Sequence, residues 1–225
     1  FAVGRFDNAT NLLYPAVRSI LLASITAIIV VGIGLFLAFL TRINAPGWFN
    51  RSIQTASLGY AIPGTVLGLG VLIVLSQFDD FSSQFHNLSF LPILSGSVFA
   101  VIFAYSLRFL SISFGTFEAE LSRIPKTTDM AASTLGAKTF QLLRLVHLPI
   151  LRPALLTASV LVFVDTMKEL PATLILRPFN FETLATLVYN YASVGQIEDA
   201  ALPALIIVGI GIVPVFIATR KLHKH

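Results

Sequence analysis

The stretch SILLASITAIIVVGIGLFLAFLT (Ser19–Thr41) runs for 23 residues without a charged side chain. A helix needs about 20 mainly apolar residues to cross the hydrocarbon core of a bilayer, so the stretch predicts a transmembrane helix. The composition of the whole chain also indicates a membrane protein. Of its 225 residues, 56% are hydrophobic and only 12% are charged, with a mean hydropathy of +0.84. Soluble domains carry about 25% charged residues, so the composition indicates an all-α integral membrane protein.

Four more segments have the length and hydropathy of membrane spans. Together with the first they predict five transmembrane helices in a single domain over residues 1–225; the four are Thr55–Gln77, Leu91–Gly115, Pro153–Leu176 and Ala200–Thr219. The third span contains Arg108, and the fourth contains Asp165, Lys168 and Glu169. Ionisable residues within a span usually face the interior of a helix bundle or a wet cavity, so these four are candidate functional residues.

The distribution of basic residues between the loops predicts the orientation. If the N-terminus lies outside, the inner segments 42–54, 116–152 and 220–225 hold ten Lys and Arg residues, and the outer segments hold three. Cytoplasmic loops of membrane proteins carry such an excess, so we expect the N-terminus outside and the C-terminus in the cytoplasm. The excess of basic residues therefore reflects topology, and we expect no nucleic-acid partner.

The longest inner loop contains an ordered polar stretch, DMAASTLGAKTFQLLRLVHLP (Asp129–Pro149). Thr127 or Thr128 is expected to cap a short helix. Gly136 should end this helix, since glycine readily takes the left-handed conformation, and a second helix is expected over Ala137–Val146. On physical grounds alone, an amphipathic connector lying on the lipid headgroups fits this pattern equally well.

The spacing within this loop resembles the signature of permease subunits of binding-protein-dependent ABC importers. That signature reads Glu-Ala-Ala, three residues, Gly, nine residues, then Ile-x-Leu-Pro. Here Met130-Ala131-Ala132 is followed after three residues by Gly136, and after nine more by Val146-His147-Leu148-Pro149. Met130 replaces the glutamate of the signature, so any ion pair made by that acid would have to come from Asp129, one residue earlier.

The resemblance implies the fold of a type I ABC importer transmembrane domain and a mechanism of alternating access. The loop 116–152 would couple the membrane helices to a dimer of cytoplasmic ATP-binding subunits, which bind ATP and Mg²⁺. The chain lacks a Gly-x-x-x-x-Gly-Lys-Ser/Thr phosphate loop, so we expect a transport subunit that is not an enzyme and binds no cofactor. The expected coupling residues are Asp129, Met130, Ala131, Ala132, Gly136, Ala137, Lys138, Gln141, Arg144, Leu148 and Pro149.

Two further stretches, LGYAIPGTVLGLGVL (Leu58–Leu72) and KELPATLILRPFNFETLATLVYNYAS (Lys168–Ser193), resemble ferric-iron importer permeases in particular. This resemblance implies Fe³⁺ as the transported substrate, a periplasmic iron-binding protein as partner, and a location in the bacterial plasma (inner) membrane. Such permeases commonly contain two homologous halves, so the chain, which begins with Phe1, is expected to be one half, the C-terminal one. The second half would belong to the same chain or to a homologous subunit.

Other functions fit parts of the pattern. A permease of the same family for thiamine, a polyamine, sulfate or phosphonate would share the coupling loop. A secondary transporter or channel would need no ATP-binding subunit and would leave the ordered loop without a partner.

Fe³⁺ prefers carboxylate and phenolate oxygens, which makes Tyr60, Tyr105, Asp165 and Glu169 the candidates for the substrate path. Asp165 and Glu169 are four residues apart and would share a helix face. Arg108 is expected to form a structural ion pair with Asp165. No residue is firmly assigned as a metal ligand.

Overall fold

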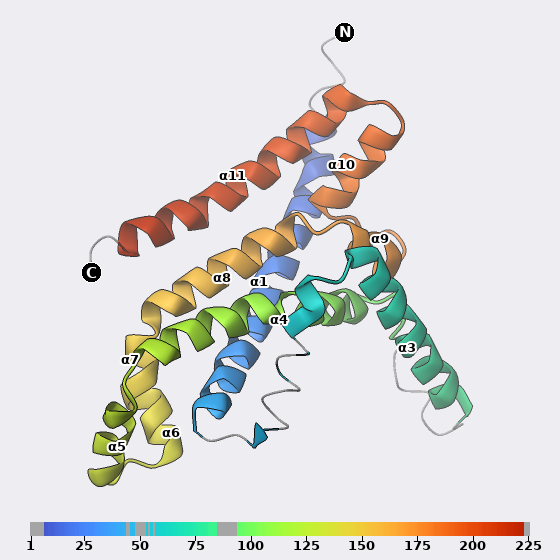
Figure 1. The fold of residues 1–225 in the computed structure, drawn as a ribbon. Helices are drawn as coiled ribbons and strands as arrows, with labels where there is room; N and C mark the ends of the chain where they lie inside the picture. Colours follow the sequence, from blue (N-terminus) through green and yellow to red (C-terminus); the bar gives the residue numbers. More distant parts are fainter. Residues whose placement is uncertain are drawn as a thin grey trace.

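The computed structural model describes residues 7–43, 46–47, 53, 55, 57–84 and 94–222, and this part of the chain is helical without a strand (Figure 1). The elements are α1 (Asp7–Arg42), η1 (Ser57–Tyr60), α3 (Gly64–Gln84), α4 (Val98–Arg123), α5 (Lys126–Thr134), α6 (Thr139–Gln141), η2 (Leu142–His147), α7 (Leu148–Ile150), α8 (Arg152–Met167), α9 (Pro171–Leu176), α10 (Leu184–Ser193) and α11 (Ile197–Leu222). Arg51, His86 and residues 91–93 of the predicted third span lie outside the described residues.

The predicted all-helical membrane architecture is confirmed. Within the part of the chain that the structure describes, four helices are long and apolar enough to cross a bilayer: Leu12–Arg42, Gly64–Ser83, Val98–Arg123 and Ile197–Arg220. A fifth span is obtained when Thr139–Ile150 and Arg152–Met167 are taken together, but these two segments meet at an angle of 76°. Because the chain bends at Leu151, we count this span from Arg152 and treat the preceding residues as a separate hairpin.

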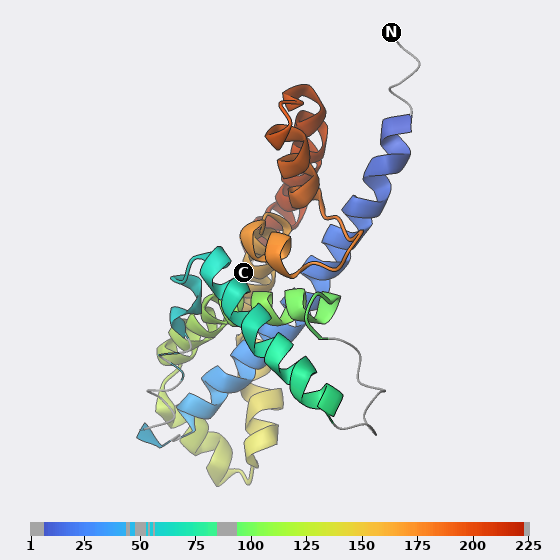
Figure 2. The same ribbon diagram turned by 90° about the vertical axis from the view of Figure 1, so that its right-hand side faces the viewer.

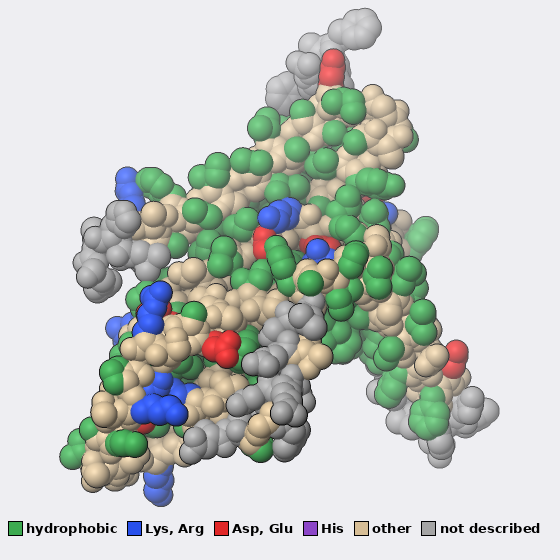
Figure 3. Space-filling model, viewed as in Figure 1, with side chains coloured by type: hydrophobic (Ala, Val, Ile, Leu, Met, Phe, Trp, Pro, Cys, Tyr) green, Lys and Arg blue, Asp and Glu red, His purple; other side chains and the backbone are tan. Residues whose placement is uncertain are grey.

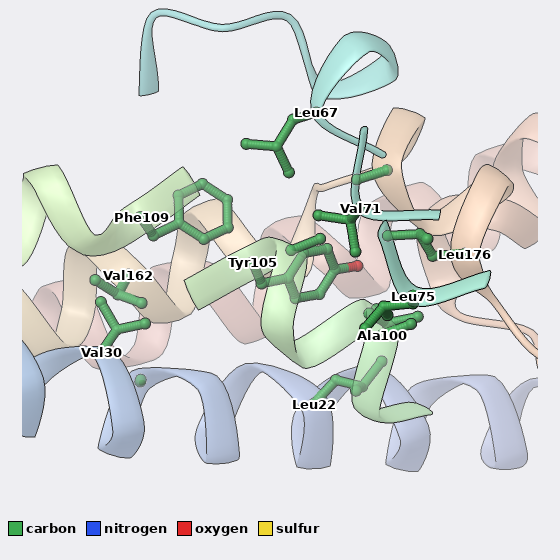
Figure 4. Packing of buried hydrophobic residues seen from close by; sticks show 14 residues of the cluster. Leu22, Val30, Leu67, Val71, Leu75, Ala100, Tyr105, Phe109, Val162 and Leu176 are labelled. Carbon is green, nitrogen blue, oxygen red and sulfur yellow. The ribbon is translucent and has the colours of Figure 1, made fainter. Parts of the chain in front are cut away.

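The core lies where α1, α4 and α8 cross (Figure 1). Val30 of α1, Val162 of α8 and Phe109 of α4 are at most 1% exposed and pack together with residues of α3 and α9 (Figure 4). Small residues at the contacts, such as Ala104 and Ala158, are fully buried and allow the helix backbones to approach closely. The core therefore fixes the relative positions of the helices that carry the candidate site residues.

The second span begins later than predicted. The expected start was Thr55, whereas α3 starts at Gly64, directly after Pro63. Proline lacks a backbone N–H and disfavours a helical residue before it, so it separates α3 from the short 3₁₀ helix η1. The span extends to Gln84 instead of Gln77, and α3 runs obliquely across the face of the molecule that is turned towards the viewer in Figure 2.

The fourth span is broken, and the prediction of one continuous helix over Pro153–Leu176 is wrong. α8 ends at Met167, and α9 begins at Pro171, which occupies its first turn. Proline is favoured there because its missing N–H would have no intrahelical partner. Lys168 and Glu169 therefore lie in a turn, and the expected helix face shared by Asp165 and Glu169 does not exist.

Helix α4 continues beyond the predicted end of the third span. Gly115 was the expected boundary, but the helix runs to Arg123. Phe117 and Leu121 are at most 3% exposed and pack in a second core cluster with α1 and α8. This packing keeps residues 116–123 helical and brings the end of α4 next to the hairpin.

Candidate functional site

The hairpin, defined here as residues 126–150, begins with α5 at Lys126. The expected cap at Thr127 or Thr128 is wrong: Pro125 is the N-cap residue, in an extended conformation without a side-chain cap. Its carbonyl accepts a hydrogen bond of 3.1 Å from the Thr128 backbone N–H. The proline ring fixes the backbone angle at the helix entrance, which replaces the expected threonine cap.

The predicted stop at Gly136 is confirmed. Gly136 has φ +83, in the left-handed region that favours glycine. Its N–H donates to the Ser133 carbonyl at 2.9 Å, and the Ala137 N–H donates to the Ala132 carbonyl at 3.0 Å. These two bonds form a Schellman motif, which satisfies the last carbonyls of α5 and turns the chain sharply.

The second half of the hairpin is helical beyond the predicted end at Val146. It consists of α6, the π-helix η2 and α7, and ends at Ile150. Gln141 Oε1 accepts a hydrogen bond of 2.9 Å from the Lys138 N–H and so caps the entrance of α6. π-Helical turns are rare and occur often at functional sites.

Large apolar side chains of the hairpin are exposed. Met130, Leu135, Phe140 and Leu145 are 66%, 89%, 69% and 68% exposed, and α5 contains no buried residue over its whole described length. The expected coupling residues Ala131, Lys138, Gln141, Arg144 and Pro149 are exposed as well, whereas Ala132, Ala137 and Leu148 are half-buried. The hairpin thus presents an apolar surface with basic side chains, suited to contact with another protein.

Asp129 points the other way, into the bundle. Its Oδ2 lies 2.7 Å from Arg42 Nε at the end of α1, and its Oδ1 lies 3.1 Å from His147 Nε2. The Arg42 side chain is 7% exposed and the His147 side chain is fully buried. The acid one position before Met130 therefore does form an ion pair, and its partner belongs to the same chain.

Arg42 also binds the end of α4. Its guanidinium donates to the carbonyls of Ile124 at 3.0 Å and Pro125 at 3.3 Å, and to that of Leu121. A helix end leaves its last carbonyls without intrahelical donors, and a cation there also interacts favourably with the helix dipole. Arg42 therefore joins α1, α4 and α5, and we call Arg42, Asp129 and His147 the hairpin joint.

His147 lies in the hairpin, before the bend that starts the span. Burial lowers the pKa of His147 below its ordinary value of 6.5, and the charge of Arg42 acts in the same direction, while Asp129 opposes both. Its ring lies 5.6 Å from that of Phe39 on α1. The imidazole is neutral at pH 7 and packs as part of the joint.

A second charged group lies at mid-depth of the bundle. Arg108 is about 15 Å from the start of α4 and about 22 Å from its end, at 1.5 Å per residue. We define the mid-span cluster as Tyr60, Arg108, Asp165, Lys168 and Glu169. Figure 3 shows acidic and basic side chains gathered at the centre of an otherwise largely hydrophobic face.

The ion pairs of this cluster differ from the expected Arg108–Asp165 pair, which is wrong. Arg108 Nε lies 3.3 Å from Glu169 Oε2, and Lys168 Nζ lies 2.8 Å from Asp165 Oδ1. The break after Met167 is the cause, because it turns Glu169 towards α4 and leaves Lys168 one turn above Asp165.

The Arg108–Glu169 pair lies against the N-terminus of α3. A Cβ atom on Gly64 would lie 2.6 Å from Arg108 Nη1 and 2.7 Å from Glu169 Oε1, so any side chain at this position would displace the paired charged groups. Glu169 Oε1 also accepts a bond of 3.4 Å from the Ala172 N–H at the start of α9. Three helices therefore hold the pair in place.

The two tyrosines have different environments. Tyr60 is 49% exposed, and its ring centre lies 6.0 Å from Arg108 Cζ. Tyr105 is 1% exposed and its hydroxyl is hydrogen-bonded to Thr173 in the core (Figure 4). Tyr60 is therefore open to solvent beside Arg108 and Tyr105 is packed in the core, and the substrate-path role of both tyrosines stays a prediction. No group of three or more His, Cys, Asp or Glu residues suited to a metal ion occurs within the described ranges.

Sequence patterns point to neither Arg42 nor His147. Arg42 and Asp129 are 87 residues apart, and the one signal for Arg42 is its place at the end of the first span. His147 lies outside the predicted spans. Lys168 is among the candidate functional residues, but its pair with Asp165 depends on the helix break, of which Pro171, three residues later, is the sequence signal.

Curated transport proteins are similar to the chain along most of its length, although no family model matches it. The Fe(3+)-transport system permease protein FbpB 2 of Haemophilus influenzae is 29% identical over 177 residues, covering 79% of this chain. The chain spans only 32% of that protein. The putative 2-aminoethylphosphonate transport system permease protein PhnV of Salmonella typhimurium is 28% identical over 219 residues, covering 93% of this chain and 76% of the relative.

Solved structures share the fold. A chain of a bacterial ABC transporter that imports alginate superposes with a TM-score of 0.77 at 14% identity, covering 97% of this chain and 83% of that one. An inward-facing chain of the MetNI methionine ABC transporter gives 0.72 at 16% identity, with 95% of each chain covered. The candidate spans and the similarity to the permease relatives indicate a multi-pass protein of the bacterial inner membrane. The chain is homologous to transport-system permease proteins and has the fold of an ABC importer transmembrane domain.

Proposed function

We propose that the chain forms one half of the translocation path of an ATP-driven importer, with the hairpin seated on a separate ATP-binding subunit. In this arrangement the N-terminus lies outside, and the hairpin and the C-terminus lie in the cytoplasm, as the ten-to-three bias of basic residues favours. A second permease half, from the same polypeptide or a homologous subunit, completes the path. A periplasmic binding protein delivers the cargo.

The observation that carries the proposal is the two-sided construction of the hairpin. Its outer side exposes Met130, Leu135 and Phe140, and its inner side is fixed to α1 and α4 by the hairpin joint. An apolar exposed surface on a rigidly attached element is what a docking site requires. An amphipathic connector lying on headgroups would need the apolar surface but not the buried ion pair.

Movement of the docked subunit would reach the membrane helices through this joint. When two ATP-binding subunits close on ATP, the hairpin is displaced together with Arg42, and hence with α1. Since α1 packs along α4 and α8, the displacement also moves the mid-span cluster that lies between α4, α8 and α3. The chain itself contributes the lever and the path, while nucleotide chemistry belongs to the partner.

Ferric iron is the cargo that we propose first, supported by the similarity to the FbpB permeases and by the stretches Leu58–Leu72 and Lys168–Ser193. A 2-aminoethylphosphonate-type cargo is the second candidate. It is favoured by the PhnV relatives, which this chain matches over a larger share of both sequences.

Co-purification of the full permease with its ATP-binding subunit tests the docking. Gly136→Val forces a β-branched residue to φ +83 and should reduce the recovered ATP-binding subunit at least tenfold. Gly209→Val is the matched control, because a Cβ atom there meets nothing within 4 Å, and it should leave recovery unchanged. Equal recovery with both variants, or uptake that runs on an ion gradient without ATP, would contradict the proposal.

A further inference from the structure

The mid-span cluster exposes its cationic and phenolic groups and buries its carboxylates. The side chains of Glu169 and Asp165 are 7% and 16% exposed, whereas that of Lys168 is 63% exposed. Tyr60 is 49% exposed. The surface that a ligand would meet is therefore formed by an ammonium group and a phenol, with the Arg108 guanidinium, 18% exposed, behind them.

An exposed ammonium at this depth needs a polar surrounding. A charged side chain in contact with lipid tails at the middle of a bilayer is strongly unfavourable. Lys168 is adjacent to Glu169, whose partner Arg108 lies about 15 Å from the nearer end of α4, so its ammonium group belongs to the mid-span cluster. The face that carries Lys168 and Tyr60 therefore borders a wet path or the second permease half.

The groups that the cluster offers for hydrogen bonds to a ligand are mainly donors. Both carboxylates are already occupied, Asp165 by Lys168 and Glu169 by Arg108 and the Ala172 N–H. An ammonium group has three N–H donors and a guanidinium has five, and neither can accept a hydrogen bond. Because the two carboxylates are 16% and 7% exposed, the groups of the cluster that are most open to a ligand are the Lys168 N–H and Tyr60 O–H donors, which bind acceptor oxygens.

The charge balance of the cluster also favours an anionic ligand over a bare cation. Two basic and two acidic side chains sum to zero, so the cluster has no excess negative charge to replace the hydration of a bare trivalent cation. An anionic oxygen on the ligand, in contrast, can bind the exposed cation with a charge-assisted hydrogen bond.

We propose that Lys168, Tyr60 and Arg108 form an oxyanion-binding site on the translocation path. The cargo is recognised by its negatively charged oxygens. Iron then crosses as a complex with an oxyanion chelator and not as the bare ion, and an organophosphonate uses the same donors. The inference rests on the proposed function, because it assumes that this face lines the path.

Two substitutions with opposite expected effects on oxyanion binding test the site in the purified full permease complex. Methylphosphonate and ferric citrate serve as oxyanion probes, and La³⁺ in a non-coordinating buffer serves as the bare hard cation. Lys168→Met removes the exposed cation and should weaken binding of both oxyanion probes about tenfold. Asp165→Asn releases Lys168 from its ion pair and should strengthen the binding of both oxyanion probes. Arg220→Met removes an exposed cation far along α11 and should leave the binding of both oxyanion probes unchanged.

The opposite pattern would overturn the site. A bare-cation site predicts that La³⁺ binds, that Asp165→Asn weakens this binding and that Lys168→Met strengthens it. A lipid site predicts binding of phosphatidic acid but not of soluble methylphosphonate, which would also contradict the proposal. Recovery of the ATP-binding subunit with Lys168→Met shows separately whether the importer assembly is intact, so that failure of the site and failure of the proposed function are distinguished.

Discussion

The hairpin joint and the mid-span cluster are built around the same pair, an arginine and a carboxylate from distant parts of the chain, yet they differ in enclosure. Arg42 is 7% exposed and donates to Asp129 and to three backbone carbonyls. Arg108 is 18% exposed, faces one carboxylate and donates to one carbonyl at 3.4 Å, with the exposed Lys168 nearby. In the first pair the arginine is the more enclosed partner and joins three elements, whereas in the second pair the carboxylate is the more enclosed partner, at 7% exposure, and the arginine is left nearer to a ligand.

Arg42→Met should have the largest effect. It leaves the partly buried Asp129 and the end of α4 without their donor, and removing one partner of such a pair costs about 3–5 kcal/mol in the free energy of unfolding. Thermal unfolding of the detergent-solubilised protein measures this loss. Arg123→Met is the control, since Arg123 is 74% exposed and its pair with Glu120 should contribute less than about 1 kcal/mol. Equal losses of unfolding free energy in the two variants would mean that burial of the arginine does not determine how much its ion pair contributes to stability.

Gly64→Ala should perturb the mid-span cluster itself. The added Cβ would lie 2.6 Å and 2.7 Å from the two charged groups and 3.2 Å from Pro171 Cβ, and such overpacking costs about 1–3 kcal/mol. Gly70→Ala, on the same helix, meets nothing within 4 Å and should be neutral or stabilising by about 0.5–1 kcal/mol. Unfolding midpoints of the two variants give the comparison. An unchanged unfolding midpoint in Gly64→Ala would show that the side chains of the cluster rearrange easily and are not held in place by three helices.

Acidification should weaken the joint through His147. Burial keeps the folded-state pKa of His147 below its unfolded value, so the unfolded state binds the proton more readily. The stability that this group contributes is complete above pH 6.5 and is lost as the pH falls through the lowered folded pKa. The unfolding midpoint should therefore fall between pH 7.5 and pH 5, and it should fall less in His147→Gln. The same fall in both proteins would assign the pH dependence to other groups.

Met130→Glu should have the smallest effect on stability. Met130 is 66% exposed and, although next to Asp129 in sequence, is turned about 100° from it around α5, so the change should stay within about 0.5 kcal/mol. Unfolding midpoints check this, with Arg42→Met as the sensitive reference. A loss comparable to that of Arg42→Met would mean that position 130 also takes part in the joint.

Local features of the sequence predicted local structure well. The five spans follow from hydropathy, and the stop at Gly136 follows from the conformational freedom of glycine. Pro63 and Pro171 mark two helix starts that hydropathy alone does not predict, because the apolar segments continue across both prolines. The partners of Arg42 and Arg108 could not be predicted, since these pairs join residues 87 and 61 positions apart and depend on how the helices cross. The roles of Asp129 and Met130 also required the structure, because only the fold shows which of two adjacent residues faces inward.

The hairpin is connected to the membrane helices at three places: to α4 through Ile124 and Pro125, to α8 through the bend at Leu151, and to α1 through Arg42. Three attachment points that are not on one line determine the orientation of a rigid body. A tilt of the hairpin alone would therefore disrupt at least one of these attachments, so a push at its tip is passed on to the membrane helices. Any partner that moves it does work on three membrane helices at once.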